Sequence, residues 1–165
     1  MKKLIHFGLF ALLIVFGTQV NIANALDEDI GPEVSQLLGP IRSNLPGNSS
    51  SADLHHAILH LDQNVSVDFA FRFHIKQRWR TIFGWVDTYN YFATVGVSAT
   101  LGANCTFPEV NIYKRDISHT GLFDLGEAAF NVLFDFLKPK LEDYVKANLP
   151  KYLQSKPAGQ ILGCN

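Results

Sequence analysis

A long amphipathic segment near the C-terminus constrains the fold most. Between Leu125 and Gln154, apolar residues recur at the i, i+3, i+4, i+7 spacing of one helical face. They are Ala129, Val132, Leu133, Phe136, Leu137, Leu141, Tyr144, Val145, Leu149, Tyr152 and Leu153. Such a helix would be about 45 Å long at 1.5 Å per residue, and we expect Pro139 to kink it near the middle. So long an apolar stripe requires an equally long apolar surface to cover it.

The strongest strand pattern lies between Val65 and Lys76, where apolar and more polar residues alternate strictly. Its apolar positions are Val65, Val67, Phe69, Phe71, Phe73 and Ile75. Further strands are predicted over residues 80–87, 89–101 and 109–116, with turns at 87–88, 102–104 and 118–121. Residues 52–61 fit either a helical turn or a strand, and favour a strand from Ala57 onward.

Residues 27–45 carry apolar side chains at helical spacing, with acidic residues at the start. Gly39-Pro40 interrupts this pattern, which indicates a kinked helix or a short helix followed by a turn. The element order therefore predicts an α+β domain. In it, a long curved antiparallel sheet of four to five strands wraps around the long C-terminal amphipathic helix, and a shorter helix lies at the N-terminus.

The first 25 residues are typical of a secretory signal peptide. Lys2 and Lys3 precede an apolar run, and Ala23-Asn24-Ala25 is a small-residue cleavage site. A transmembrane anchor is the alternative, but the apolar run is short for one. We therefore expect residues 26–165 to form a single secreted, extracellular domain.

Cysteine and asparagine positions are consistent with secretion. Cys105 and Cys164 are the cysteines of the chain, and in an oxidising compartment they most simply form one disulfide. Free thiols or an intermolecular bridge are the alternatives. Asn48 and Asn64 lie in glycosylation sequons, as does Asn104, whose neighbour Cys105 makes it a poor acceptor.

No catalytic pattern stands out. The chain lacks a Gly-x-Ser-x-Gly motif and a phosphate-binding glycine loop, and Asp68, Asp87 and Asp116 are scattered. His55, His56 and His60 could be zinc ligands, but solvent-facing histidines are the preferred interpretation. The formal charge of −1, with no basic block, gives no support for nucleic-acid binding. We expect neither an enzyme nor a cofactor or metal.

The late helix and the segment that leads into it resemble those of a known protein family. The segment 122–126 leads into Phe130-Asn131-Val132-Leu133, and Lys138-Pro139 follows inside the same helix. This order is similar to that of takeout-like proteins in the tubular lipid-binding superfamily, which also includes juvenile-hormone-binding proteins, bactericidal/permeability-increasing protein and group-seven mite allergens. Long strands before the late helix fit the same scheme. The resemblance implies that a lipid or other apolar small molecule binds between sheet and helix.

Two functional hypotheses follow. In the first, the protein carries a hydrophobic ligand such as a fatty acid, sterol or terpenoid. The expected lining residues are Phe69, Phe71, Phe73, Tyr91, Val95, Leu133, Phe136, Leu137, Leu141 and Tyr144. A filled aromatic core is the alternative interpretation of the same residues. In the second hypothesis, the protein binds a membrane or microbial lipid through an exposed patch in which Trp79 and Trp85 lie close to Arg78 and Arg80.

Overall fold

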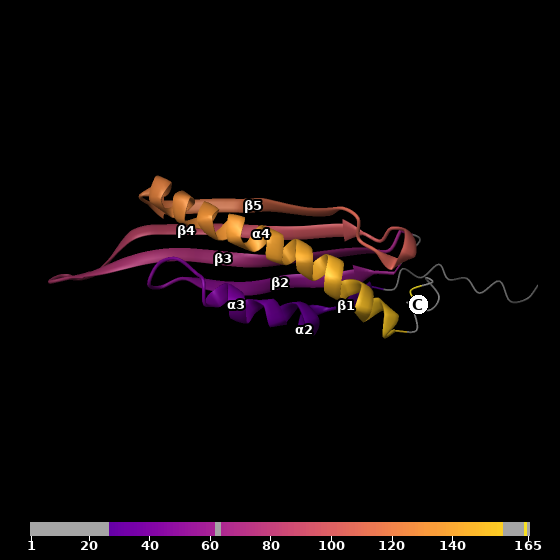
Figure 1. Ribbon diagram of the computed structural model, residues 1–165. Helices are drawn as coiled ribbons and strands as arrows, with labels where there is room; N and C mark the ends of the chain where they lie inside the picture. The colour runs from indigo at the N-terminus through magenta and orange to yellow at the C-terminus, as the bar shows by residue number, and fades with distance from the viewer. Residues whose placement is uncertain (1–26, 62–63, 157–163, 165) are drawn as a thin grey trace, which may run out of the picture.

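The computed structural model describes residues 27–61, 64–156 and 164, and its centre is a five-stranded antiparallel sheet (Figure 1). The strands are β1 (Asp27–Asp29), β2 (Ser51–His60), β3 (Ser66–Thr81), β4 (Gly84–Thr100) and β5 (Val110–Gly121). Their order in the sheet is the order in the chain, so the sheet is a meander. The helices are α2 (Gly31–Val34), α3 (Leu38–Arg42) and α4 (Phe123–Gln154), with 3₁₀ turns at Ser35–Leu37 and Ala103–Cys105.

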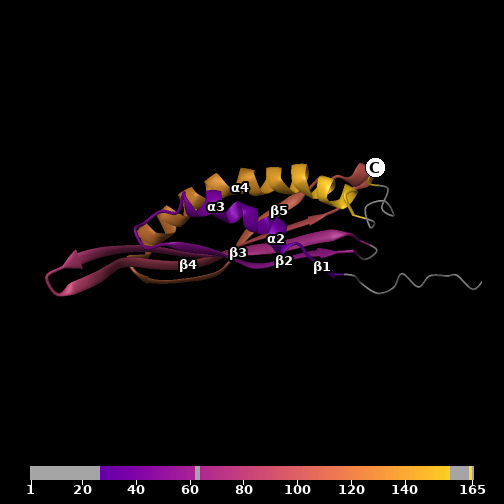
Figure 2. The ribbon, with the colours of Figure 1, turned by 90° about the horizontal axis from the view of Figure 1, so that it is seen from below.

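Sheet and helices form two layers, with the helices on one face of the sheet (Figure 2). The long α4 crosses that face diagonally and packs on β3, β4 and β5, whereas α2 and α3 pack on β2. We call this the helix side of the sheet, and the opposite face the outer side.

The core lies between α4 and the apolar face of β3. Phe69, Phe71 and Phe73 alternate along the strand and are fully buried. Phe73 meets Phe130 of α4 at a ring-centroid distance of 5.8 Å, and Phe69 meets Tyr144 at 6.4 Å, both edge to face. Each buried phenylalanine contributes about 1.5–3 kcal/mol of hydrophobic stabilisation. This contact explains why the two longest apolar patterns of the sequence form a helix and a strand.

The structure confirms the α+β fold, the antiparallel sheet, the late helix and a shorter N-terminal helix. The helix begins at Phe123, two residues before the predicted start, and ends at Gln154 as predicted. It runs without interruption through Pro139 and Pro150. The disulfide between Cys105 and Cys164 is also confirmed, with Cα atoms 5.1 Å apart. The predicted signal peptide lies outside the described residues.

The predicted strand over residues 80–87 is wrong. Instead, β3 continues to Thr81, the chain reverses at Ile82-Phe83, and β4 starts at Gly84. The predicted turn at 87–88 is an irregularity inside the β3–β4 ladder, where Gln77 pairs with Tyr89 but Arg78 pairs with Asp87. The two strands form one long hairpin because pairing is possible along the whole of both segments.

Three smaller predictions also need correction. Residues 27–29 form β1 rather than a helical turn, because Asp27 and Glu28 pair with His60 and Leu59 of β2. Residues 52–56 belong to β2 with the rest of that segment. The predicted turn at 118–121 is the end of β5, which ladders with β4 up to Gly121.

A tyrosine packs on a glycine on the outer side of the sheet. Gly96 in β4 pairs with Ala70 of β3 and with Tyr113 of β5. A Cβ atom built on Gly96 would lie 2.5 Å from Cζ of Tyr113, so the phenol ring lies directly on the glycine backbone. Ala70, the partner of Gly96 in β3, is fully buried on this side, which none of the helices in the described chain covers (Figure 2).

Candidate functional site

The end of the β3–β4 hairpin projects beyond the helix layer (Figures 1 and 2). Tyr89 of β4 pairs with Gly121, which lies just before α4, so the helix starts beside the middle of the hairpin. From Gln77, the partner of Tyr89, four more strand residues lead to the turn at Ile82, and they span about 13 Å at 3.3 Å per residue. We call residues 77–88 the hairpin end.

Large apolar side chains gather on the hairpin end. Ile82 and Phe83 at the turn are 92% and 93% exposed, and Trp79 and Trp85 beside them are 63% and 58% exposed. Val86 is also exposed. A cluster of exposed aromatic and aliphatic side chains marks an interaction surface in a folded protein.

The turn itself does not require these apolar residues. The Thr81 hydroxyl donates a hydrogen bond to the Gly84 carbonyl at 2.9 Å and accepts one from the Phe83 amide at 3.2 Å. Gly84 has a φ of 117°, a conformation that glycine adopts without strain. Thr81 and Gly84 therefore close the turn, and polar residues would serve equally well at the two positions between them.

The two sides of the hairpin end differ in chemistry. Trp79 pairs with Val86, and because Trp79 follows Ile75 by four residues, this pair lies on the helix side of the sheet. Arg80 pairs with Trp85 on the outer side, where Arg78 and Asp87 also pair. The hairpin end thus has an apolar turn, an apolar side and a basic, tryptophan-containing side.

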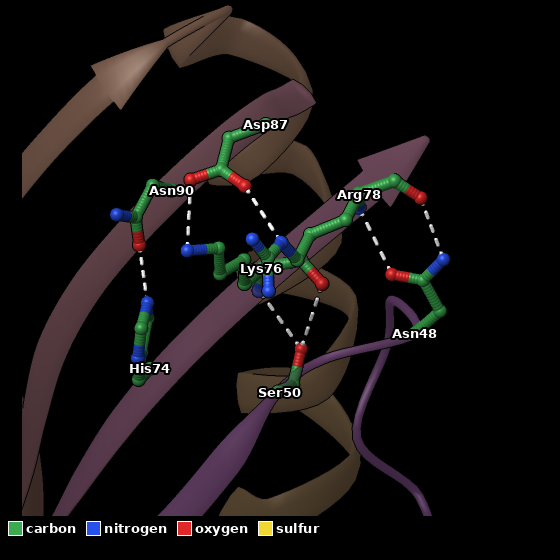
Figure 3. A network of polar contacts seen from close by, with 7 residues as sticks. All are labelled: Asn48, Ser50, His74, Lys76, Arg78, Asp87 and Asn90. Atoms are coloured by element: carbon green, nitrogen blue, oxygen red, sulfur yellow. Dashed lines mark hydrogen bonds and ion pairs between the residues drawn. The ribbon is translucent and has the colours of Figure 1, made fainter. Parts of the chain in front are cut away.

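A charged network lies on the basic side (Figure 3). Asp87 accepts from Lys76 at 2.8 Å and from Nε of Arg78 at 3.0 Å. The hydrogen bond from Lys76, reinforced by the charge of Arg78, holds the pKa of the Asp87 carboxyl below its usual value. The Arg78 guanidinium lies 5.7 Å from the Trp85 ring centroid. Within the described chain, no ion pair or hydrogen bond is seen for Arg80.

A loop before β2 supports the base of the hairpin end. The Asn48 amide donates to the Arg78 carbonyl at 2.7 Å, and the Arg78 amide donates to the Asn48 carbonyl oxygen at 2.9 Å (Figure 3). Ser50 accepts from the Lys76 amide at 2.9 Å. Before β2 begins at Ser51, these two side chains therefore bond to the backbone of β3 in place of a paired strand. The predicted glycosylation acceptor Asn48 is therefore part of this support, and glycosylation of Asn48 and Asn64 stays a prediction.

The residues predicted to line a ligand site lie together between sheet and helix. The fully buried members are Phe69, Phe71, Phe73, Tyr91, Val95, Leu133, Leu137 and Leu141. Tyr144 is half-buried, and burial raises its pKa to about 12. Phe136 is partly exposed. All of these residues except Phe136 belong to one hydrophobic core cluster or, as Tyr144 does, pack against it, and their role in ligand binding stays a prediction.

A shallow groove adjoins two of these residues. It has a volume of about 190 Å³ and lies between the loop after α3 and the first half of α4. Its walls are Asn44, Pro46, Ala129, Val132, Leu133 and Phe136. Val132 is 73% exposed at its rim, so the groove offers an apolar surface that is accessible from solvent.

The histidines are distributed along the strands. His56 contacts Asp68, the His60 Nδ1 donates to the Asp27 carboxylate at 2.7 Å, and Arg72 donates to His55 at 3.1 Å. Burial, together with the nearby Arg72 charge, lowers the pKa of His55. Across the residues that the structure describes, no group of three histidine, cysteine or acidic side chains is placed to hold a metal ion. His119, predicted in a turn, belongs to β5.

Sequence reasoning identified the tryptophans and arginines of this site but missed Ile82 and Phe83. The sequence pattern places both inside a predicted strand, since the segment contains no Asn-Gly or Asp-Gly pair to mark a turn. The available signal was Gly84, which follows two large apolar residues.

In the described part of the chain, no helix is long and apolar enough to cross a membrane. The Cys105–Cys164 disulfide is compatible with a secreted protein. The resemblance to the tubular lipid-binding superfamily stays a prediction, because no protein-family model, no curated protein and no solved structure matches this chain.

Proposed function

We propose that this protein is secreted and binds lipid surfaces through the hairpin end. The observation that carries the proposal is the near-complete exposure of Ile82 and Phe83 at the outermost point of a projecting hairpin. In the proposed bound state these two side chains enter the acyl region. Trp79 and Trp85 then lie in the interfacial layer that tryptophan favours, and the arginines lie near the headgroups.

The size and shape of the hairpin end favour a lipid layer over a protein partner. A stable protein interface needs a partner surface of complementary shape, which for a projecting strand end means a matching cleft. A lipid layer accepts a narrow convex element, because its molecules rearrange around the inserted side chains. Burying Ile82 and Phe83 supplies about 1.5–3 kcal/mol each before the cost of association. Binding through them is therefore weak and reversible unless the basic residues contribute.

Vesicle co-sedimentation tests the proposal directly. We expect the mature protein to pellet with phosphatidylcholine vesicles, and the double variant Ile82→Asp/Phe83→Asp to lose at least about tenfold in affinity. Ile117→Asp is the matched control, because Ile117 is an exposed apolar residue of β5 outside the hairpin end. Equal binding by the folded double variant and the wild type would refute the proposal.

The groove beside α4 supports a second candidate function, the carriage of an apolar small molecule. In this proposal the sheet curves around α4, and a fatty acid, sterol or terpenoid reaches the predicted lining residues through the groove at Val132 and Phe136. Native mass spectrometry of the secreted protein, followed by solvent extraction, would detect a stoichiometric ligand. A clean apo mass, and no uptake of a fluorescent fatty acid, would argue against a carrier.

A further inference from the structure

A hollow lies on the basic side of the hairpin end, close to where a lipid surface would be in the proposed function. Its volume is about 200 Å³, and its lining residues are Asn48, Ser49, Arg78 and Trp85. Two of these residues belong to the hairpin and two to the supporting loop, so the hollow exists only because the loop packs against β3.

The lining offers hydrogen-bond donors to an anion. Arg78 donates through Nε to Asp87, and no partner of its two Nη groups is seen within the described chain. Ser49 adds a hydroxyl group, and Trp85 adds an aromatic ring with one N–H donor. A guanidinium group, a hydroxyl and an indole around one small hollow suit a tetrahedral oxyanion better than they suit an apolar ligand.

The arginine is held in place from two directions. Its backbone amide and carbonyl are both bonded to the Asn48 side chain, and its Nε donates to Asp87 (Figure 3). The guanidinium also lies 5.7 Å from the Trp85 ring centroid. Such anchoring limits the conformational entropy that a flexible arginine loses on binding an anion.

The charge and position of the hollow are consistent with an anionic lipid. The hairpin end and the adjoining Lys76 together carry three basic residues and one acidic residue, whereas the whole chain has a formal charge of −1. Arg78 precedes Ile82 by four residues, which is about 13 Å along a strand. With the turn in the acyl region, that distance places Arg78 at the level of the headgroup phosphates, since each interfacial layer is about 5–8 Å thick.

We infer that the Asn48–Ser49–Arg78–Trp85 hollow binds a phosphate group, and that this phosphate belongs to an anionic phospholipid headgroup. The inference rests on the proposed function and assigns its ligand class. Free phosphate shares the chemistry, so the test must separate the two sources.

The test compares vesicles of phosphatidylcholine alone with vesicles that also contain phosphatidic acid. We expect wild type to prefer the anionic vesicles and Arg78→Gln to lose about tenfold or more of that preference. Arg80→Gln is the matched control, since it removes the same charge two residues away and outside the hollow. We expect it to cost about fivefold, the general electrostatic effect of one basic residue near an anionic membrane. Ser49→Ala, which changes no charge, should cost about two- to fivefold.

A titration with inorganic phosphate forms the second arm, followed through the NMR signal of the Trp85 indole N–H. We expect phosphate to shift this signal in the wild type and not in Arg78→Gln. Equal effects of Arg78→Gln and Arg80→Gln, with none from Ser49→Ala, would overturn the site while leaving insertion of Ile82 and Phe83 intact. A phosphate-induced shift without any preference for anionic vesicles would overturn the lipid as its source. Loss of binding to both vesicle types in Ile82→Asp/Phe83→Asp tests the proposed function separately.

Discussion

The two halves of the β3–β4 hairpin both carry large apolar side chains but have different surroundings. In the half under α4, the apolar residues of β3 face the helix and are fully buried, as Phe71 and Phe73 show. In the half beyond α4, the same face of β3 carries Gln77, Trp79 and Thr81, and the Trp79 side chain lies largely in solvent. An apolar side chain on this face is thus placed beyond the helix that would cover it.

This difference separates residues that stabilise the fold from residues available for binding. Buried phenylalanines contribute to the free energy of folding, whereas Ile82 and Phe83 change their exposure little when the chain folds. Their apolar character brings a risk of aggregation without a gain in stability. That cost is consistent with a role in binding.

The largest expected difference is in stability. Phe71→Ala should lower the free energy of unfolding by about 3–5 kcal/mol, because it leaves a cavity beneath α4. Phe83→Ala should change it by less than about 0.5 kcal/mol, since the side chain is exposed. Urea denaturation of both variants measures the two effects. Similar losses of unfolding free energy in the two variants would mean that the Phe83 side chain is packed against other residues rather than exposed.

Removing the disulfide tests whether a change at one end of the hairpin affects lipid binding at the other end. Cys105 follows the C-terminal end of β4, and the turn precedes its N-terminal end, about 55 Å away at 3.3 Å per residue. Replacing both cysteines by serine should cost about 2–4 kcal/mol in unfolding free energy. Vesicle affinity of the folded variant should stay within about twofold of the wild type, because no contact of the hairpin end changes. A large loss of affinity would show that the ends are coupled.

Removal of the supporting loop contact should act locally. Asn48→Ala deletes both hydrogen bonds to the Arg78 backbone, and we expect the hairpin end to become less stable against local opening by about 1–2 kcal/mol. Amide hydrogen exchange at Arg78 measures this effect. Asn44→Ala is the control, because the Asn44 amide bonds to the Pro40 carbonyl at 2.7 Å, away from the hairpin. Equal exchange at Arg78 in the two variants would contradict the supporting role.

The smallest effect concerns the far end of α4. Lys156 donates to the Glu28 carboxylate at 2.8 Å, and this bond, with a second from Tyr152, holds the pKa of Glu28 below its usual 4.5. The wild type should therefore exceed Glu28→Gln in stability by about 0.5–1 kcal/mol at neutral pH.

The sign of the pH dependence follows from the lowered pKa. The advantage over Glu28→Gln is present above pH 4.5 and is lost as the pH falls through the lower, folded-state value. Urea midpoints of both proteins at neutral pH and at about pH 3 measure it. A difference that persists unchanged at the lower pH would show that the carboxylate charge is not its source.

Long periodic segments were the predictable part of this fold. The alternation before Lys76 and the stripe up to Gln154 gave β3 and α4, because each has an apolar face that must be buried. Residues 27–29 could not be assigned from local pattern, since their strand conformation depends on pairing with β2, about thirty residues away.

The candidate site was predictable only in part. Trp79, Trp85 and the neighbouring arginines were recognisable as a chemical group, whereas their exposure was not. The exposure of these side chains depends on the pairing of Tyr89 with Gly121, because this pairing determines where α4 begins along the hairpin. The turn was missed for a similar reason, because a side-chain hydrogen bond of Thr81 closes it rather than a recognisable turn motif.

The contact between Tyr113 and Gly96 limits which substitutions the protein can accept at these two positions. A Cβ atom at position 96 would lie 2.5 Å from the far end of the Tyr113 side chain, so a substitution there requires the phenol ring to move. Substitutions at the two positions are therefore interdependent: a larger residue at 96 is accommodated more readily when a smaller one is present at 113. Homologous chains should show paired exchange at these positions, with the combined volume of the two side chains nearly constant.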